Sequence, residues 1–491
     1  MNMKKSILIL LAGTTLLAGC NLAPKYERPA GAVPVALPQG GVYPAAPTDA
    51  QDVSRIGWRD FFLDDRLRQV IETGIANNRD LRIAAANVQQ ARAQYRVQRA
   101  DRLPTVNATG TATYTNNLAS MGGGAGSSSS DIEVYQATVG LSAFELDLFG
   151  RVRNLSRAAQ EQYFASEEAQ RSARISLIAE IANAWLTMAS DSEQLRLSRE
   201  TAKAFEETLR LTREQFRVGV GSELEVRQAE TSYQGAVNDI AALETSVARD
   251  QNALNLLVGT TVPAEQLPNA FGKEPTTRDA LPGDVSSEVL LRRPDVLQAE
   301  HLLIAENANI GAARAAFFPT ISLTGTLGTL STALSGLFKD GSYTYTGSPG
   351  ASLPLFDFGR RSGNLEYARA SQKVAVATYE KAVQTAFREV SDALAQRGRI
   401  GDQIRAQTTR AEAAGVAARL SDARFRSGVD SFLVTLDAQR TAYGAEQALV
   451  TTRLTQASNL VELYRSLGGG LADEPLHGEA RNGEIDTSGA P

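Results

Sequence analysis

The sequence predicts an α+β membrane protein built from two structural repeats, each with a pair of β-strands and a very long helical hairpin. An internal duplication, alternating strands of about ten residues and helical segments too long for a compact domain support this prediction. The chain has 491 residues, a formal net charge of −5, two histidines and one cysteine. This composition indicates no nucleic-acid partner, and it is a poor basis for metal or thiol chemistry.

The N-terminus has the pattern of a secretory signal. Two lysines, Lys4 and Lys5, precede an apolar run that is too short to span a bilayer. The run ends in Leu17-Ala18-Gly19-Cys20, which resembles the bacterial lipobox. Residues 1–19 are therefore predicted to be a signal peptide, with lipidation of Cys20 by a diacylglycerol and an N-acyl chain. A soluble periplasmic protein with one spare thiol is the alternative.

The segment after the predicted lipid anchor has its own composition. Asn21 follows Cys20, in place of the Asp that resembles an inner-membrane retention signal, so the outer membrane and its lipids are the predicted location. Residues 20–50 are rich in Pro, Ala and Gly and have neither a helical nor a strand period. This composition predicts an extended, lipid-anchored tether.

The chain contains an internal duplication. Phe216-Arg217-Val218-Gly219-Val220 recurs as Phe425-Arg426-Ser427-Gly428-Val429, an offset of 209 residues. The same offset pairs Phe149-Gly150-Arg151 with Phe358-Gly359-Arg360. Upstream the offset is 215 residues, as from Pro104 to Pro319. The first copy must therefore have a longer connection between its strands, where a Gly/Ser-rich run predicts a flexible loop.

Each copy is predicted to contain a first helix, a strand pair and a helical hairpin. Both first helices are expected to stop at a proline. The predicted segments are first helices within 51–103 and 294–318, strand pairs at 104–149 and 319–358, hairpins at 150–260 and 359–468, an inter-repeat connection at 261–293 and a polar tail at 471–491.

Four segments alternate between apolar and Ser/Thr-rich positions. They are Thr105–Tyr114, Tyr135–Ser142, Thr320–Leu327 and Tyr343–Phe358, the last of which is weakened by two prolines. Such alternation is typical of transmembrane β-barrel strands. Four ordinary half-buried strands of a soluble sheet are the alternative, because the signal from each strand is weak.

The segment Arg151–Val218 contains neither Gly nor Pro. An unbroken helix of this length would extend about 100 Å. Its apolar positions form a narrow seam that predicts side-by-side packing of the coiled-coil kind. The seam runs through Ile178, Ile181, Trp185, Met188, Leu195, Ala202, Leu209 and Phe216. A plain long coiled coil is the alternative.

Four membrane strands cannot close a barrel, and open strand edges are not tolerated in hydrocarbon. Two chains would give eight strands and an interior filled by side chains. Three chains would give twelve strands and a lumen, which suits the Ser/Thr-rich faces. We therefore predict a homotrimer with a 12-stranded transmembrane β-barrel, continued by a long α-helical barrel.

A series of motifs extends over nearly the whole chain. They are the lipobox followed by Asn-Leu-Ala-Pro-Lys-Tyr, the two Phe-Gly-Arg joints, Arg292-Arg293-Pro294-Asp295, Phe318-Pro319 and Phe425-Arg426-Ser427-Gly428-Val429. In this order they resemble the outer membrane factor family, the TolC- and OprM-type channels of tripartite efflux pumps. The resemblance implies a homotrimer whose helical barrel lies in the periplasm, with a periplasmic adaptor protein and an inner-membrane pump of the resistance-nodulation-division type as partners. It implies a passive exit duct for drugs or other small molecules, without enzymatic activity or cofactor.

The resemblance also implies a constriction just after the second hairpin turn. Leu433 and Asp437 match the positions of an apolar ring and an acidic ring, and their spacing of four places them on one helix face. Asp430 is predicted to be a third residue of this aperture, and because it stands where some members carry an arginine, the resemblance leaves open whether a salt-bridge lock exists here. The alternative for Asp437 is a solvated carboxylate on the helix surface. Its counterpart in the first copy is Gln228.

The two hairpin turns are predicted to contact the adaptor, although glycines there would also serve simply to end the helices. The residues are Val218, Gly219, Val220, Gly221, Ser427, Gly428 and Val429. A structural coiled-coil lipoprotein or adaptor is the second hypothesis for the whole chain. A secreted enzyme is the third, but His301 is expected to be a surface residue with no nucleophile partner.

Overall fold

The computed structural model describes residues 21–44, 56–115, 132–271, 275–279 and 287–469. The predictions for the signal peptide, Cys20, the Gly/Ser-rich loop and the polar tail lie outside these residues. The described residues form two compact units. The first unit holds the described parts of Met1–Ala30, Asn87–Glu167 and Gln298–Tyr379, and the second holds those of Gly31–Ala86, Glu168–Leu297 and Glu380–Pro491.

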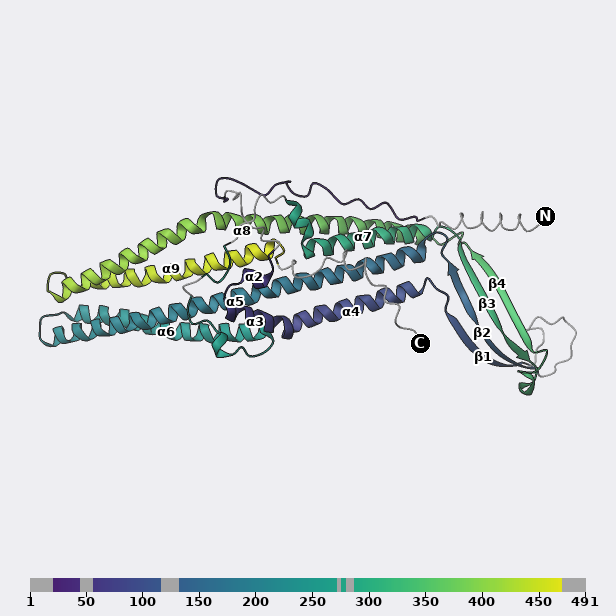
Figure 1. The fold of residues 1–491 in the computed structure, drawn as a ribbon, viewed down its shortest axis with the longest axis horizontal. Coiled ribbons are helices and arrows are strands. Elements are labelled where there is room, and N and C mark those ends of the chain that lie inside the picture. Colours follow the sequence, from purple (N-terminus) through teal and green to yellow (C-terminus); the bar gives the residue numbers. More distant parts are fainter. Residues whose placement is uncertain (1–20, 45–55, 116–131, 272–274, 280–286, 470–491) are drawn as a thin grey trace. The chain divides into compact units, whose positions relative to one another are not determined.

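In both repeats a strand pair and two long helices follow an initial helical part, which within the described ranges comprises three helices in the first repeat and one α-helix in the second (Figure 1). The first repeat contains α2 (Trp58–Phe61), α3 (Asp65–Asn77), α4 (Arg79–Ala100), β1 (Val106–Thr115), β2 (Ile132–Leu146), α5 (Arg151–Arg217) and α6 (Glu223–Val258). The second contains α7 (Pro294–Ala315), β3 (Thr320–Ser331), β4 (Tyr343–Ser352), α8 (Arg360–Arg426) and α9 (Phe432–Ser466). Short 3-10 turns lie at Ala264–Gln266, Ser287–Arg292 and Leu334–Gly336. None of the helices in the described ranges is long and apolar enough to cross a membrane.

The four strands form one antiparallel sheet in the order β1-β2-β3-β4 (Figure 1). The register places apolar residues side by side across the whole sheet, as in the row Ala108, Val139, Leu327, Tyr345. The neighbouring row is Thr109, Thr138, Gly328, Thr344. The sheet therefore has one apolar face and one face rich in Ser and Thr, as the alternation in the sequence predicts.

Strand β2 continues four residues beyond its predicted end at Ser142. The register shifts between Leu141 and Phe144, and the intervening Ala143 has a φ of 49°. The Ala143 N–H donates to Thr324 Oγ1 at 3.0 Å. Because the irregularity restores the alternation, Phe144 lies opposite Leu323 on the apolar face. Strand β4, by contrast, ends at Ser352, six residues before its predicted end.

The first helix predicted for repeat one, within 51–103, is interrupted at Asn78, so the prediction of one continuous helix there is wrong. The Asn78 side chain accepts a hydrogen bond from the Leu81 N–H at 2.8 Å and donates one to Leu257 O at 2.8 Å. Asn78 thus caps the start of α4 and fixes it to the end of α6. Helix α4 ends at Ala100, earlier than the predicted stop at Pro104.

The long apolar seam of α5 is buried over most of its length. Trp185 is 1% exposed, and its indole N–H donates to Gln266 O in the inter-repeat connection at 3.1 Å. Leu195, Ala202 and Leu209 are also buried. The prediction fails at Phe216, which is 48% exposed because the helix ends one residue later and no other element of the unit covers it.

The Arg-Arg-Pro-Asp motif has a structural role within the second unit. Arg293 is 5% exposed and donates to Ser466 O at the end of α9 at 2.7 Å. It also forms ion pairs with Asp295 at 2.7 Å and with Glu389 of α8 at 2.9 Å. A buried guanidinium is tolerated when its donors are satisfied in this way. The motif therefore holds α8 and α9 at the start of α7.

The predicted N-terminal tether is bound to the protein along its described part. Asn307 Nδ2 donates to Pro24 O at 2.8 Å, and Arg314 Nη1 donates to Leu22 O at 3.1 Å. Glu300 accepts hydrogen bonds from Tyr26 and Arg28, whose guanidinium donates to both carboxylate oxygens. Because backbone carbonyls and a partly buried carboxylate hold residues 21–28 against α7, this part is not a free tether.

The end of α6 depends on a glycine. Gly259 has a φ of 77°, and a Cβ atom there would lie 2.5 Å from Asn77 O. Gly259→Ala should lower the free energy of unfolding by more than the ~1–2 kcal/mol of a left-handed alanine, because the backbone clash adds to it. Gly235→Ala is the matched control: Gly235 lies in α6 with nothing within 4 Å. Thermal unfolding midpoints that fall equally in both variants would contradict this account.

Candidate functional site at the ends of the helical hairpins

The two hairpin turns have the same backbone geometry. The Val220 N–H donates to Gln215 O at 2.9 Å, and the Val429 N–H donates to Arg424 O at 2.9 Å. Gly219 and Gly428 have φ values of 81° and 74°. These are left-handed glycines that close the preceding helix, so they fit the helix-ending role whether or not they contact a partner.

The return helices begin differently in the two turns. Ser222 and Glu225 form a reciprocal capping box at the start of α6, with hydrogen bonds of 3.3 Å and 2.8 Å. Ser431 makes no side-chain capping bond at the start of α9, where Val434 occupies the position equivalent to Glu225. Since a cap typically contributes about 1 kcal/mol, the start of α9 is less firmly held than the start of α6.

Asp430 is engaged within its own turn. Its carboxylate accepts hydrogen bonds from Arg424 Nε at 2.7 Å and Nη2 at 2.8 Å. These bonds hold the pKa of Asp430 below its usual value. The sequence analysis assigns Asp430 to the aperture, and in the structure its carboxylate bonds to Arg424 and braces the second turn.

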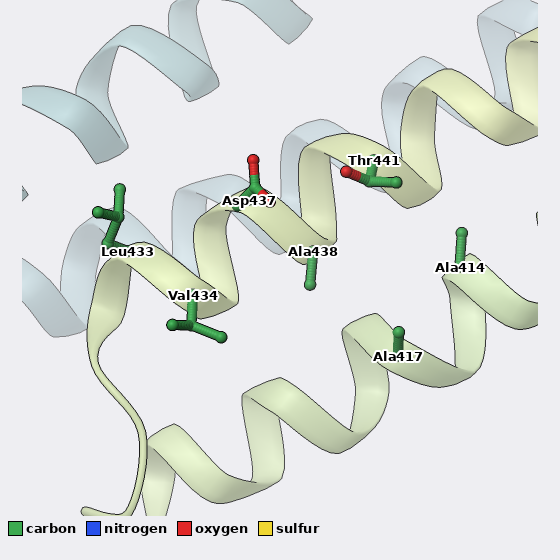
Figure 2. Close-up of a pocket in the computed structure, with 7 residues that line it drawn as sticks. All are labelled: Ala414, Ala417, Leu433, Val434, Asp437, Ala438 and Thr441. Carbon is green, nitrogen blue, oxygen red and sulfur yellow. The ribbon is translucent and has the colours of Figure 1, made fainter.

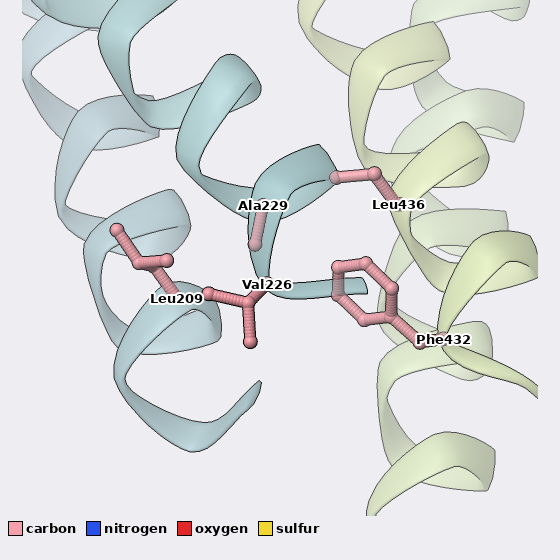
Figure 3. Close-up of a cluster of buried hydrophobic side chains, with 5 residues drawn as sticks. All are labelled: Leu209, Val226, Ala229, Phe432 and Leu436. Atoms are coloured by element: carbon pink, nitrogen blue, oxygen red, sulfur yellow. The ribbon is translucent and has the colours of Figure 1, made fainter. Parts of the chain in front are cut away.

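One face of α9 is buried against the first hairpin (Figure 3). Phe432 and Leu436 are 1% and 3% exposed. They pack with Leu209 of α5 and with Val226 and Ala229 of α6. The buried face therefore fixes the rotation of α9 about its own axis.

The side chain of Thr435 completes this buried face. Its hydroxyl donates to Ser421 O of α8 at 3.1 Å, so a polar group next to the apolar cluster is satisfied by the partner helix. The tie joins the two helices of the second hairpin directly behind the exposed face of α9.

The opposite face of α9 carries the predicted constriction residues. Leu433 and Asp437 point the same way, and Val434 and Ala438 point toward α8 (Figure 2). Leu433 is 58% exposed. The Asp437 carboxylate is exposed and forms no ion pair within the described residues. These side chains line an open groove of about 580 Å³, together with Ala414, Ala417 and Thr441.

A tyrosine further along α9 ties this helix to the first hairpin. The Tyr443 hydroxyl donates to Asp239 Oδ2 of α6 at 2.8 Å and lies 2.8 Å from Ser198 Oγ of α5. Burial raises the pKa of Tyr443 to about 12, so the hydroxyl stays protonated at neutral pH. Sequence reasoning missed this group, because a single tyrosine in a polar helix gives no signal of a distant carboxylate.

The remaining predicted residues lie where a partner has access to them. Val218, Val220 and Val429 are 59%, 77% and 61% exposed. His301 is partly exposed, at 26% of its side-chain surface, and its Nδ1 lies 2.8 Å from the carboxylate oxygen Glu161 Oε2. Over the ranges that the structure describes, no cluster of His, Cys, Asp or Glu side chains has the make-up of a metal site.

Comparisons with known proteins cover most of the chain. Residues 70–260 and 285–469 match the sequence profile of a family described as "Outer membrane efflux protein". The chain is 45% identical over 476 residues to "Probable efflux pump outer membrane protein TtgC" of Pseudomonas putida, covering 96% of this chain and 97% of that protein. It is 42% identical over 459 residues to outer membrane protein OprJ of Pseudomonas aeruginosa, covering 92% and 94%.

Solved structures with the same fold are similar in sequence as well. A membrane protein from Pseudomonas aeruginosa aligns with a TM-score of 0.85 and 40% identity, over 93% of this chain and 99% of that one. The open state of the MtrE outer membrane channel of Neisseria gonorrhoeae aligns with a TM-score of 0.83 and 36% identity, over 92% and 99%.

The tyrosine tie predicts a measurable loosening of α9. Tyr443→Phe removes the donor to Asp239, at a cost of about 1–2 kcal/mol. Backbone amides of α9 around Tyr443 should then exchange hydrogen about 5–30 times faster. Tyr233→Phe is the matched control, because its ring packs in the same region and its hydroxyl has no hydrogen bond within the described residues. Equal exchange in both variants would argue against the tie.

Proposed function

The chain belongs to the outer membrane efflux protein family, and on that premise we propose that it is the outer-membrane exit channel of a tripartite efflux pump. Membership of this family confirms the resemblance noted in the sequence. The family consists of transport channels and not of enzymes, so export is the activity to test. The single observation that carries the proposal is the match to curated efflux proteins over nearly the full length of both chains.

The transmembrane part of the proposed channel is a barrel shared by three chains. Strands β1 and β4 are the edges of the four-stranded sheet, and their outer backbone groups need partners in hydrocarbon. The apolar face would contact lipid, and the Ser/Thr-rich face would line a water-filled lumen. Three chains would supply twelve strands. Two chains would supply only eight strands, and side chains fill the interior of an eight-stranded barrel.

The N-terminus of the proposed channel is anchored by lipid. A diacylglycerol and an N-acyl chain on Cys20 would insert into the outer membrane, and together they suffice for stable attachment. The bound segment from Leu22 to Arg28 supports this proposal, because it fixes the chain directly after the anchor to the folded protein.

The partners of the proposed channel are a periplasmic adaptor protein and an inner-membrane pump of the resistance-nodulation-division type. The exposed valines at both hairpin turns would meet the adaptor. Energy would come from the pump, and the channel itself would be a passive conduit. Relatives of 45% and 42% identity are named for efflux of antibiotics, toluene and solvents, which supports drugs and other small molecules as the cargo.

The proposed constriction is formed by Leu433 and Asp437 of three chains around one axis. Both side chains lie on the exposed face of α9, while the opposite face is fixed by Phe432 and Leu436. Three carboxylates that meet at the axis repel one another and attract cations. The aperture would therefore be narrow, acidic and sensitive to cations.

Removal of the acidic ring should open the channel. Asp437→Ala replaces three carboxylates with smaller, uncharged side chains, so single-channel conductance in planar bilayers and antibiotic entry into cells should both rise. Gln228→Ala, at the equivalent position of the first repeat, is the matched control and should change neither. The assignment of Asp437 to the aperture fails if its variant also leaves both quantities unchanged.

Deletion of the gene should make cells more susceptible to exported compounds. A panel of dyes, detergents, antibiotics and organic solvents would identify the cargo from the growth defects that the intact gene reverses. Deletion of the cognate pump should give the same profile, because the channel is passive. Unchanged susceptibility across the panel, together with no conductance from the purified protein, would contradict the channel.

A further inference from the structure

We propose that a cavity beside the N-terminal segment binds the phosphate of an anionic phospholipid, with Lys25 and Arg157 as the cations that hold it. The phospholipid has a hydroxyl-bearing headgroup without an ammonium group, as in phosphatidylglycerol, and comes from the membrane leaflet that anchors the chain. The inference rests on the lipid anchor proposed above. It adds a second lipid site, which is formed by side chains and not by a covalent bond.

The cavity lies within the first unit, between the N-terminal segment and two helices. Helix α7 supplies Ile304 and Ala308, helix α5 supplies Arg157, and the N-terminal segment supplies Asn21 and Lys25. Its volume is about 390 Å³. Sites for small molecules typically have volumes of about 300–1,000 Å³, so the cavity can hold a phosphate with a small headgroup.

The N-terminal wall of the cavity is held by both helices. Asn21 Oδ1 accepts a hydrogen bond from Asn154 Nδ2 of α5 at 3.0 Å, and Pro24 O accepts one from Asn307 Nδ2 of α7 at 2.8 Å. These bonds fix the backbone next to Lys25 to the folded protein. The cavity is therefore formed before any ligand enters it, which lowers the entropic cost of binding.

Both charged side chains that line the cavity are cations. Lys25 is exposed and forms no hydrogen bond or ion pair within the described residues. Arg157 Nε lies 4.0 Å from Glu161 Oε1, at the outer limit of an ion pair, while Glu161 Oε2 lies 2.8 Å from His301 Nδ1. A phosphate between the two cations would relieve their repulsion and accept charge-assisted hydrogen bonds from both.

The uncharged part of the lining selects the headgroup. None of the described residues that line the cavity has a carboxylate, so a headgroup ammonium would meet two cations and no anion. The nearby carboxylate of Glu300 is already bonded to Tyr26 and Arg28. The side-chain amides of Asn21 and Asn307 are polar groups that suit hydroxyls. A glycerol headgroup therefore fits this lining better than an ethanolamine headgroup.

The position of the cavity places it at a lipid surface. Asn21, which lines it, directly follows the predicted acylation site Cys20. Arg157 lies six residues after the start of α5, and Ala308 lies seven residues before the end of α7. Along both helices the cavity is thus about 10 Å from the ends that lead to the strands. In the proposed channel this is the headgroup layer below the hydrocarbon.

Native mass spectrometry of the protein purified from outer membranes tests the site. Phosphatidylglycerol and phosphatidylethanolamine with the same acyl chains are titrated separately, and bound lipids are counted per chain. We expect one phosphatidylglycerol per chain, and binding of phosphatidylethanolamine that is weaker by roughly tenfold. The double variant Lys25→Gln with Arg157→Gln should weaken phosphatidylglycerol binding about tenfold for each cation removed, because each loses a charge-assisted hydrogen bond.

Two further double variants separate the cavity from general electrostatics and from misfolding. Arg96→Gln with Lys373→Gln removes the same two charges from exposed positions of the same unit that do not line the cavity, and should leave binding unchanged. Lys25→Arg with Arg157→Lys keeps both charges and should retain the preference for phosphatidylglycerol. Equal losses in the first two double variants would overturn the cavity as the binding site.

Competition experiments identify the source of the phosphate. Inorganic phosphate or glycerol 1-phosphate that displaces phosphatidylglycerol at equal concentration would overturn the lipid as the ligand and leave a site for a free anion. Equal affinity for the two lipids would overturn the selection of the headgroup. We expect neither, because the acyl chains of the lipid remain in the detergent micelle next to the cavity and add to its affinity.

Separate readouts distinguish this proposal from the proposed function. The mass of the unsubstituted chain shows whether it is acylated, and a chain without acyl groups would overturn the anchor on which the inference rests. A protein that conducts in planar bilayers but binds no phosphatidylglycerol would overturn the lipid site alone. A protein that binds the lipid but does not conduct would support the site and contradict the channel.

Discussion

The antiparallel pairing of β2 with β3 is the constraint on which the rest of the fold depends, because it joins the two repeats through backbone hydrogen bonds. It places the apolar residues of all four strands on one face and leaves β1 and β4 as the edges. In the proposed channel those edges would need partners in the membrane, so the pairing that unites the repeats would also call for association with further copies. The stack of Phe149 on Phe318 extends this joint to the start of the long helix α5.

The two repeats share their backbone geometry and differ in how the return helices are held. Helix α6 starts with a capping box, whereas α9 starts without a side-chain cap and is held by the burial of Phe432 and Leu436. The Asp430–Arg424 pair braces the turn that precedes α9. The repeat without the cap is also the one with the exposed Leu433 and Asp437, so the proposed aperture lies on a helix that is oriented by packing and by hydrogen bonds to its neighbours, and not by a cap at its start.

Several buried or partly buried polar side chains connect elements that are distant in the sequence. Asn78 joins the end of α6, Arg293 joins α8 and α9, and Tyr443 joins α9 to α6. In each case a side chain that would be costly to bury alone is satisfied by a carbonyl or carboxylate of another helix. These hydrogen bonds and ion pairs are directional. They therefore fix the position of each helix along its neighbour, which apolar packing by itself would leave free to shift.

The sequence by itself determined the duplication, the alternation of the strands and the extent of the long helices, because these depend on periodicity and on glycine or proline positions within one segment. It also placed Leu433 and Asp437 on one face, since residues four apart share a helix face. Only the tertiary structure decided the break at Asn78, the bulge in β2, the pairing of Asp430 with Arg424 and the bound N-terminal segment. The tie from Tyr443 to Asp239 belongs with these, because each such contact joins side chains or backbone groups whose proximity no local pattern encodes.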